Sequence, residues 1–147
     1  MLTFNTKELK NTKLTNKEIE ALMQGATLEV GFFETATYPN GTQVAQVAKW
    51  NELGTINTPA RPFMRSSVAK NKDNWLKRIP HAYQSTGMDN KKALGIVGEL
   101  IRGDIIKEIT AFTTPPNAPS TIKAKGSSNP LIDTGLMRRS VTYRVSK

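Results

Sequence analysis

Apolar side chains recur at steps of three and four in three segments of the chain, which is the spacing of an amphipathic helix. The first segment covers residues 43–53 and precedes Gly54, where a helix C-cap is expected. The second begins near Ser66 and reaches Pro80, which is expected to kink or end the helix. The third begins around Asp89. Its apolar stripe consists of Leu94, Val97, Ile101, Ile105 and Ile109.

Shorter patterns predict one further helix and two strands. Thr15 and Glu18 have the spacing of a capping box, which predicts a short helix over residues 16–24 that stops at Gly25. Alternation of apolar and polar residues, the period of a half-buried strand, occurs near both ends of the chain. The alternating apolar positions are Leu28, Val30 and Phe32 in the first strand and Val141, Tyr143 and Val145 in the last.

Proline and glycine mark the connections between these elements. Residues 38–41 are expected to form a turn, and two prolines keep the backbone of residues 56–62 extended. Residues 112–130 contain four prolines among serines, threonines and lysines, which is the composition of a loop. A loop of that length is uncommon in a compact domain unless it has a function or is disordered.

The segment before the last strand, residues 133–136, predicts a tight turn or a single turn of helix. The Asp133 side chain is expected to cap this turn, and Gly135 is expected to adopt a positive φ. A plain turn that enters a strand explains the same residues equally well.

The order of these elements predicts an α+β fold. Strands lie near both ends and the helices are grouped between them, without the strand and helix alternation of a doubly wound sheet. We therefore expect a single domain over residues 1–147, in which an antiparallel sheet packs against three to four helices. A long proline-rich loop is expected before the C-terminal strand.

Charge leaves two interpretations open. The chain carries 21 lysines and arginines against 12 aspartates and glutamates, a formal charge of +9, and this favours acidic partners such as nucleic acid. The basic residues are dispersed from Lys7 to Lys147 and form no aromatic-basic motif of the kind that stacks bases, so a solvated surface is the preferred interpretation. No segment has the apolar run of a signal peptide or a membrane span, and no membrane partner is expected.

Residue types that carry chemistry are scarce. His81 is the only histidine and cysteine is missing, so no paired nucleophile and base or thiolate metal site is expected. Acidic residues show no calcium-loop spacing, and no glycine-rich phosphate loop follows a strand. We therefore predict a protein that is not an enzyme, with no catalytic residues, no metal and no cofactor.

Three segments resemble the bacteriophage virion-morphogenesis family, the tail-completion and head-tail joining proteins of Mu-like and other long-tailed phages. Residues 48–55 read AKWNELGT, similar to the end of a family helix. Residues 59–65 read PARPFMR, similar to the family pattern with Met64 in place of leucine. Residues 130–141 read PLIDTGLMRRSV, similar to the family's C-terminal pattern. The chain departs from the family by an insertion around residues 74–84.

This resemblance implies a structural virion protein at the head-tail junction, either a tail terminator or a neck or connector subunit. It implies a symmetric ring, with six copies as the expected number, between the tail tube and the portal complex. Neck, portal-adaptor and tail-tube proteins would be the partners, and DNA would at most pass through the lumen. The alternative is a small basic protein that binds nucleic acid.

Candidate interface residues gather in the resembling segments and in the proline-rich loop. They are Arg61, Pro62, Phe63, Met64, Arg65, Lys123, Lys125, Asp133, Arg138 and Arg139. The apolar tip at Phe63 either inserts into a neighbour or folds onto the core of its own chain, and the sequence favours neither. Residues 112–130 are predicted to supply contacts between subunits.

Overall fold

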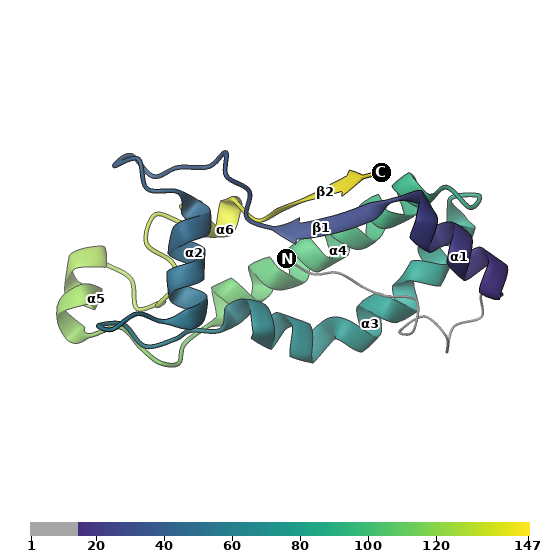
Figure 1. Ribbon diagram of the computed structural model, residues 1–147. Coiled ribbons are helices and arrows are strands. Elements are labelled where there is room, and N and C mark those ends of the chain that lie inside the picture. The colour runs from purple at the N-terminus through teal and green to yellow at the C-terminus, as the bar shows by residue number, and fades with distance from the viewer. Residues whose placement is uncertain (1–14) are drawn as a thin grey trace. The chain divides into compact units, whose positions relative to one another are not determined.

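The computed structural model describes residues 15–147 of the chain and confirms the α+β class (Figure 1). In chain order the elements are α1 (Asn16–Gly25), β1 (Thr27–Gly31), α2 (Val44–Leu53), α3 (Phe63–Ser85), α4 (Asn90–Ala111), α5 (Pro119–Lys125), α6 (Leu136–Arg139) and β2 (Thr142–Ser146). The described residues thus form six helices, where three to four were predicted.

The described residues divide into two compact units that are discontinuous in sequence. The first unit holds α1, both strands and residues 70–103. The second unit holds residues 32–69 and 104–141, which include α2, α5 and α6. Helices α3 and α4 each contribute residues to both units. One domain over residues 1–147 stays a prediction.

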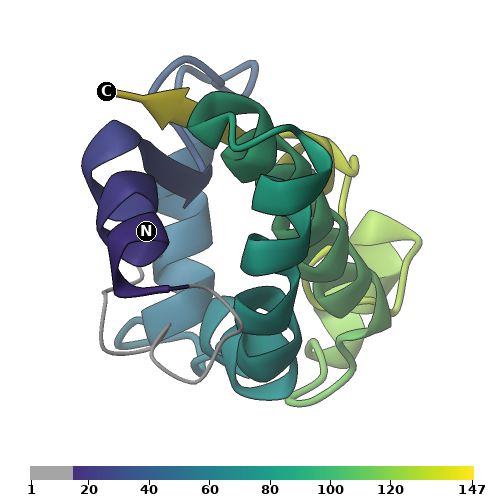
Figure 2. The same cartoon turned by 90° about the vertical axis from the view of Figure 1, so that its right-hand side faces the viewer.

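The first unit begins with the predicted capping box. The Thr15 hydroxyl accepts a hydrogen bond from the Glu18 amide at 3.3 Å, and the Glu18 carboxylate accepts one from the Thr15 amide at 2.8 Å. These bonds satisfy donors that the first turn of a helix leaves unpaired. Helix α1, purple in Figures 1 and 2, then leads directly into β1. The predicted helix over residues 16–24 is confirmed.

The two strands pair antiparallel, with Leu28 opposite Val145 and Val30 opposite Tyr143. Leu28 and Val30 are buried, and the side chains of β2 alternate between half-buried and exposed. The predicted period of two is therefore confirmed in β2 and for Leu28 and Val30 in β1. Strand β1 ends at Gly31, so Phe32, which was predicted to continue the pattern, lies beyond the strand and is half-buried.

One prediction concerns the cross-strand pair of Glu29 and Arg144. The Arg144 guanidinium donates a hydrogen bond to the Glu29 carboxylate and thereby lowers the pKa of Glu29, although desolvation partly opposes the shift. Because the folded pKa lies below the unfolded value, the stabilisation is present above the ordinary glutamate pKa and is lost as the pH falls through the lowered one. In an NMR titration, Arg144→Gln should raise the Glu29 midpoint towards its ordinary value. Equal midpoints in the two proteins would refute the assignment.

The predicted apolar stripe of α4 is buried along its whole length. Leu94 is 8% exposed, and Val97, Ile101, Ile105 and Ile109 are fully buried. Of the residues off the stripe, Ile96 is 52% exposed, whereas Leu100 and Ile106 are half-buried.

Pro80 does not end α3, which continues to Ser85. Apolar residues on both sides of the proline, Ile79 and Tyr83 among them, are buried. Tertiary packing of this kind outweighs the loss of one helical hydrogen bond donor. The expectation that the helix could end at Pro80 is therefore wrong.

Gly98 of α4 allows the sheet to approach the helix closely. A Cβ atom placed there would lie 2.6 Å from Tyr143 Cδ2 and 2.8 Å from Leu28 Cδ1, whereas one at Gly95 would have no atom within 4 Å. We expect Gly98→Ala to lower the free energy of unfolding by about 1–2 kcal/mol through overpacking. Gly95→Ala should instead raise it by up to about 1 kcal/mol through helix propensity.

Urea unfolding of the two variants beside the parent chain measures whether each substitution raises or lowers the free energy of unfolding. A stabilising effect of both substitutions would show that the close packing at Gly98 does not exist in solution.

The second unit contains α2 with its predicted boundaries. The Gly54 amide donates to the Trp50 carbonyl at 2.8 Å and ends the helix, and the turn at residues 38–41 is closed by a bond from the Gly41 amide to the Tyr38 carbonyl at 2.9 Å. Both predictions are confirmed.

The proline-rich segment 112–130 is only partly a loop, because it contains α5. Pro119 occupies the first turn of this helix and Gly126 ends it in the left-handed conformation. Proline at the start and glycine after the end are favourable positions for a helix. The prediction of a loop throughout residues 112–130 is therefore wrong.

Candidate functional site

Arg61, predicted to face a partner, is instead buried within its own unit at 5% exposure. Its Nε donates to the Pro115 carbonyl at 3.1 Å, and its Nη2 donates to the Pro116 carbonyl at 3.3 Å and to Asn117 Oδ1 at 3.1 Å. Desolvation lowers the pKa of this guanidinium. The planar fork of arginine thus anchors the start of the proline-rich segment. Arg61 as a contact between subunits is a prediction that the structure contradicts.

Phe63 is 1% exposed, so the predicted apolar tip does not protrude. Its ring contacts that of Phe32 edge to face, with centroids 6.0 Å apart. Pro62 and Met64 beside it are half-buried. Of the two alternatives left open by the sequence, the folded loop is the one observed, because an exposed phenylalanine would forgo the burial of a large apolar area.

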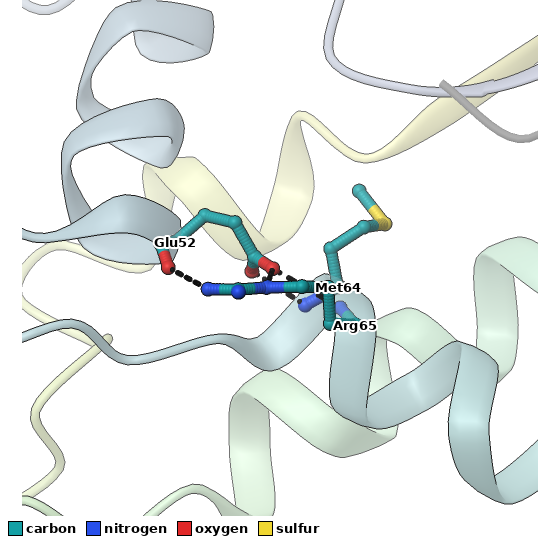
Figure 3. A network of polar contacts seen from close by, with 3 residues as sticks. All are labelled: Glu52, Met64 and Arg65. Atoms are coloured by element: carbon teal, nitrogen blue, oxygen red, sulfur yellow. Dashed lines mark hydrogen bonds and ion pairs between the residues drawn. The ribbon is translucent and has the colours of Figure 1, made fainter.

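The Glu52 carboxylate joins the end of α2 to the start of α3 (Figure 3). Its oxygens accept from the Met64 amide at 2.9 Å, the Arg65 amide at 3.2 Å and Arg65 Nε at 2.8 Å. Arg65 Nη2 also donates to the Glu52 carbonyl at 2.8 Å. A carboxylate is favoured at a helix N-terminus because it meets unpaired amides and the positive end of the dipole. This explains why α3 begins at Phe63, earlier than the predicted start near Ser66.

Asn129 fixes the segment that follows α5. Its Nδ2 donates to the Thr110 carbonyl at 2.8 Å, and its Oδ1 accepts from the Leu131 amide at 2.8 Å. A terminal carbonyl of α4 is satisfied in this way. Neither Glu52 nor Asn129 was identified from the sequence, since each joins segments that lie at least twelve residues apart, Glu52 through Met64 and Arg65 and Asn129 through Thr110.

The turn at residues 133–136 differs from the prediction in one respect. Gly135 has the predicted positive φ, 76°, and is the N-cap of α6. Because this N-cap has no side chain, the Thr134 hydroxyl accepts the Leu136 amide at 3.3 Å, and Asp133 does not cap the turn. Arg139 Nη1 donates back to the Thr134 carbonyl at 3.1 Å.

An open hollow of about 510 Å³ lies within the second unit. It is lined by residues of the segment 38–42, of α2 and of the segment 130–137, and by Lys125 at the end of α5. Its apolar lining includes Val47, Trp50, Leu131, Leu136 and Met137. We call this feature the α2 hollow.

The polar groups of the α2 hollow influence one another. Desolvation raises the pKa of Tyr38, and the negative charge of Asp133 adds to that shift. Desolvation lowers the pKa of Lys125, which the charge of Asp133 opposes. Lys125 and Asp133 are the two charged side chains that line the hollow, so their formal charges cancel.

The structure therefore brings only part of the predicted interface together. Lys125 and Asp133 share the α2 hollow, whereas Lys123 is exposed on α5. Arg138 is half-buried and Arg139 is exposed on α6. Sequence reasoning missed the α2 hollow and Trp50, because the hollow combines segments about 80 residues apart in the chain.

The first unit has a smaller open hollow of about 420 Å³, lined by Arg78, His81, Ser85 and Leu100 among others. Residues 15–147 contain no group of three or more histidines, aspartates or glutamates placed to hold a metal ion. No helix among the same residues is long and apolar enough to cross a membrane.

Comparison with known proteins identifies no relative of this chain. No protein-family model matches the chain, and searches of curated proteins and of solved structures return no match either. Any assignment of function therefore depends on the residues and their arrangement.

Proposed function

We propose that the chain is a non-enzymatic structural protein of a bacteriophage virion, a tail-completion or neck subunit that forms a ring between tail and portal. The observation that supports this proposal is the convergence of the three resembling segments. Residues 48–55, 59–65 and 130–141 all belong to the second unit. They are far apart in sequence, yet they build one connected framework.

Direct contacts join these segments. The Arg61 amide donates to the Asn51 carbonyl at 2.6 Å, and Glu52 binds Arg65 as described above. Helix α6 packs against α2. The motif residues therefore hold backbone segments in place. A structural role of this kind is expected of an assembly protein.

The surface of the second unit also has features of an interface. Trp50 is 45% exposed, Leu53 59% and Ile56 fully exposed, and all three lie on α2 or directly after it. Clustered exposed apolar residues that include an aromatic one are typical of surfaces that bind another protein.

The alternative, a small basic protein that binds nucleic acid, is favoured by the charge of +9 and by the exposed Lys123 on α5. Lysine contacts to phosphate release counterions, so binding of this kind weakens steeply with salt. Fluorescence anisotropy with duplex DNA should detect no tight or sequence-selective binding at roughly 0.2 M salt. Tight selective binding there would favour the alternative.

The proposed function is tested by the mass of the purified chain in solution. Light scattering after size exclusion should give a closed assembly, with six copies of the 16.2 kDa chain as the expected number. Electron micrographs should show rings of one size. A monomer at all concentrations would contradict the ring. Sequencing of the genomic locus provides an independent test, because portal, capsid and tail genes should flank this gene.

A further inference from the structure

The turn after α2 carries an apolar projection. Ile56 has 103% relative exposure, and Leu53, the last residue of α2, is 59% exposed. The turn is closed by hydrogen bonds from the Thr55 amide to the Thr58 carbonyl at 2.8 Å and from the Thr58 amide to the Thr55 carbonyl at 3.3 Å. We call Leu53 and Ile56 the apolar knob.

The apolar knob is held rigidly by its surroundings. The residues before it are fixed by the contacts of Glu52 with α3, and the Arg61 amide binds the Asn51 carbonyl. A projection that is already ordered loses little conformational entropy when it binds. The exposure of Ile56 is thus a stable property of the surface and can be used for recognition.

The same unit offers a receptor for such a knob. The α2 hollow has an apolar lining and a volume of about 510 Å³, which is within the range of sites that enclose a ligand. It is large enough to receive more than one aliphatic side chain. The knob sequence from Leu53 to Thr58 carries no charge, and the charges of Lys125 and Asp133 in the hollow cancel.

This neutrality argues for a second copy of the chain as the occupant. Two copies with a charge of +9 each repel one another, and a contact between them is favoured where neither surface adds net charge. Apolar patches of a few hundred Å² supply a substantial part of the roughly 800 Å² that each partner buries in a stable interface. Here the knob and the exposed Trp50 at the hollow supply the apolar surface on the two sides.

We propose that the apolar knob of one copy enters the α2 hollow of a second copy. The proposal rests on the proposed function and names the contact that would build its ring. When each copy gives its knob to the next and receives one from the previous, the contact is heterologous and closes into a ring if the rotation permits.

Engineered disulfides test this contact cleanly, because the chain contains no cysteine. An Ile56→Cys protein is mixed with a Leu136→Cys protein that carries a size tag, and the mixture is oxidised mildly. A disulfide requires Cα atoms within roughly 7 Å of each other, so it reports direct contact. The control mixture pairs Ile56→Cys with Ile96→Cys, an exposed apolar position of the first unit.

We expect the mixed disulfide to form at least tenfold faster in the test mixture than in the control. Equal rates in the two mixtures would overturn the proposed contact. Ile56→Ser should weaken association at least tenfold and leave the circular dichroism and thermal midpoint of the subunit unchanged. Unchanged association of that variant would also overturn the contact.

The double variant Ile56→Cys/Leu136→Cys separates this contact from the ring. A series of cross-linked products that ends at the mass of the parental assembly supports both the knob contact and the ring. A product that stops at two copies supports the contact but contradicts the ring. If the parent forms a ring and no cross-link appears, the proposed function stands and the knob contact is refuted.

Discussion

Arg61→Ala is expected to lower the free energy of unfolding by about 3 kcal/mol, because it leaves acceptors of a buried charged group without their donor. The acceptors are the carbonyls of Pro115 and Pro116 and the side chain of Asn117. Arg61→Lys should recover only part of the loss, since an ammonium group cannot reproduce the guanidinium fork. Urea unfolding followed by circular dichroism gives both values.

The matched control is Arg65→Ala. The Arg65 side chain is 65% exposed and forms its ion pair with Glu52 at the surface, so a loss of at most about 1 kcal/mol is expected. If the two alanine variants were equally stable, the burial and hydrogen bonding of Arg61 would not describe the protein in solution.

Gly54→Ala is expected to lower the free energy of unfolding by about 3–4 kcal/mol, from two effects that add. Gly54 has φ 77° and ψ 174°, a region that is almost restricted to glycine and is strained for other residues. A Cβ atom would also lie 2.8 Å from the Ala60 amide nitrogen and 3.0 Å from the Thr58 carbonyl oxygen. Both neighbours are backbone atoms, which cannot rotate away as a side chain can.

Gly41→Ala separates the two effects. Gly41 also has a positive φ, 83°, but a Cβ atom there would have no neighbour within 4 Å. This variant should lose about 1 kcal/mol, from backbone strain alone. Thermal unfolding of both variants beside the parent measures the difference. Similar losses in the two proteins would mean that the turn after α2 has room for a side chain.

The local parts of the fold were predictable from the sequence, because their causes lie within a few residues. The capping box at Thr15 and Glu18, the glycine end of α2 at Gly54 and the buried stripe of α4 all depend on spacing along one element. Helix α5 was missed because its proline and flanking glycine have loop composition, although their positions also suit a short helix.

The candidate site was predictable only in part, because its determinants are contacts across the chain. The sequence marks residues 59–65 as unusual but does not show that Arg61 binds carbonyls 54 and 55 residues away. Burial of Phe63 has a similar origin, since the ring finds Phe32 in the folded unit. The α2 hollow forms only when α2 meets the segment 130–137.

The close approach at Gly98 has a consequence for natural variation. Because a methyl group at this position would meet both Tyr143 and Leu28, related chains with the same sheet packing should retain glycine there. Gly95 and Gly103 face open space on the same helix, so related chains should tolerate alanine, lysine or glutamate at those positions. A relative that carries a larger residue at position 98 should show a smaller residue at position 28 or 143.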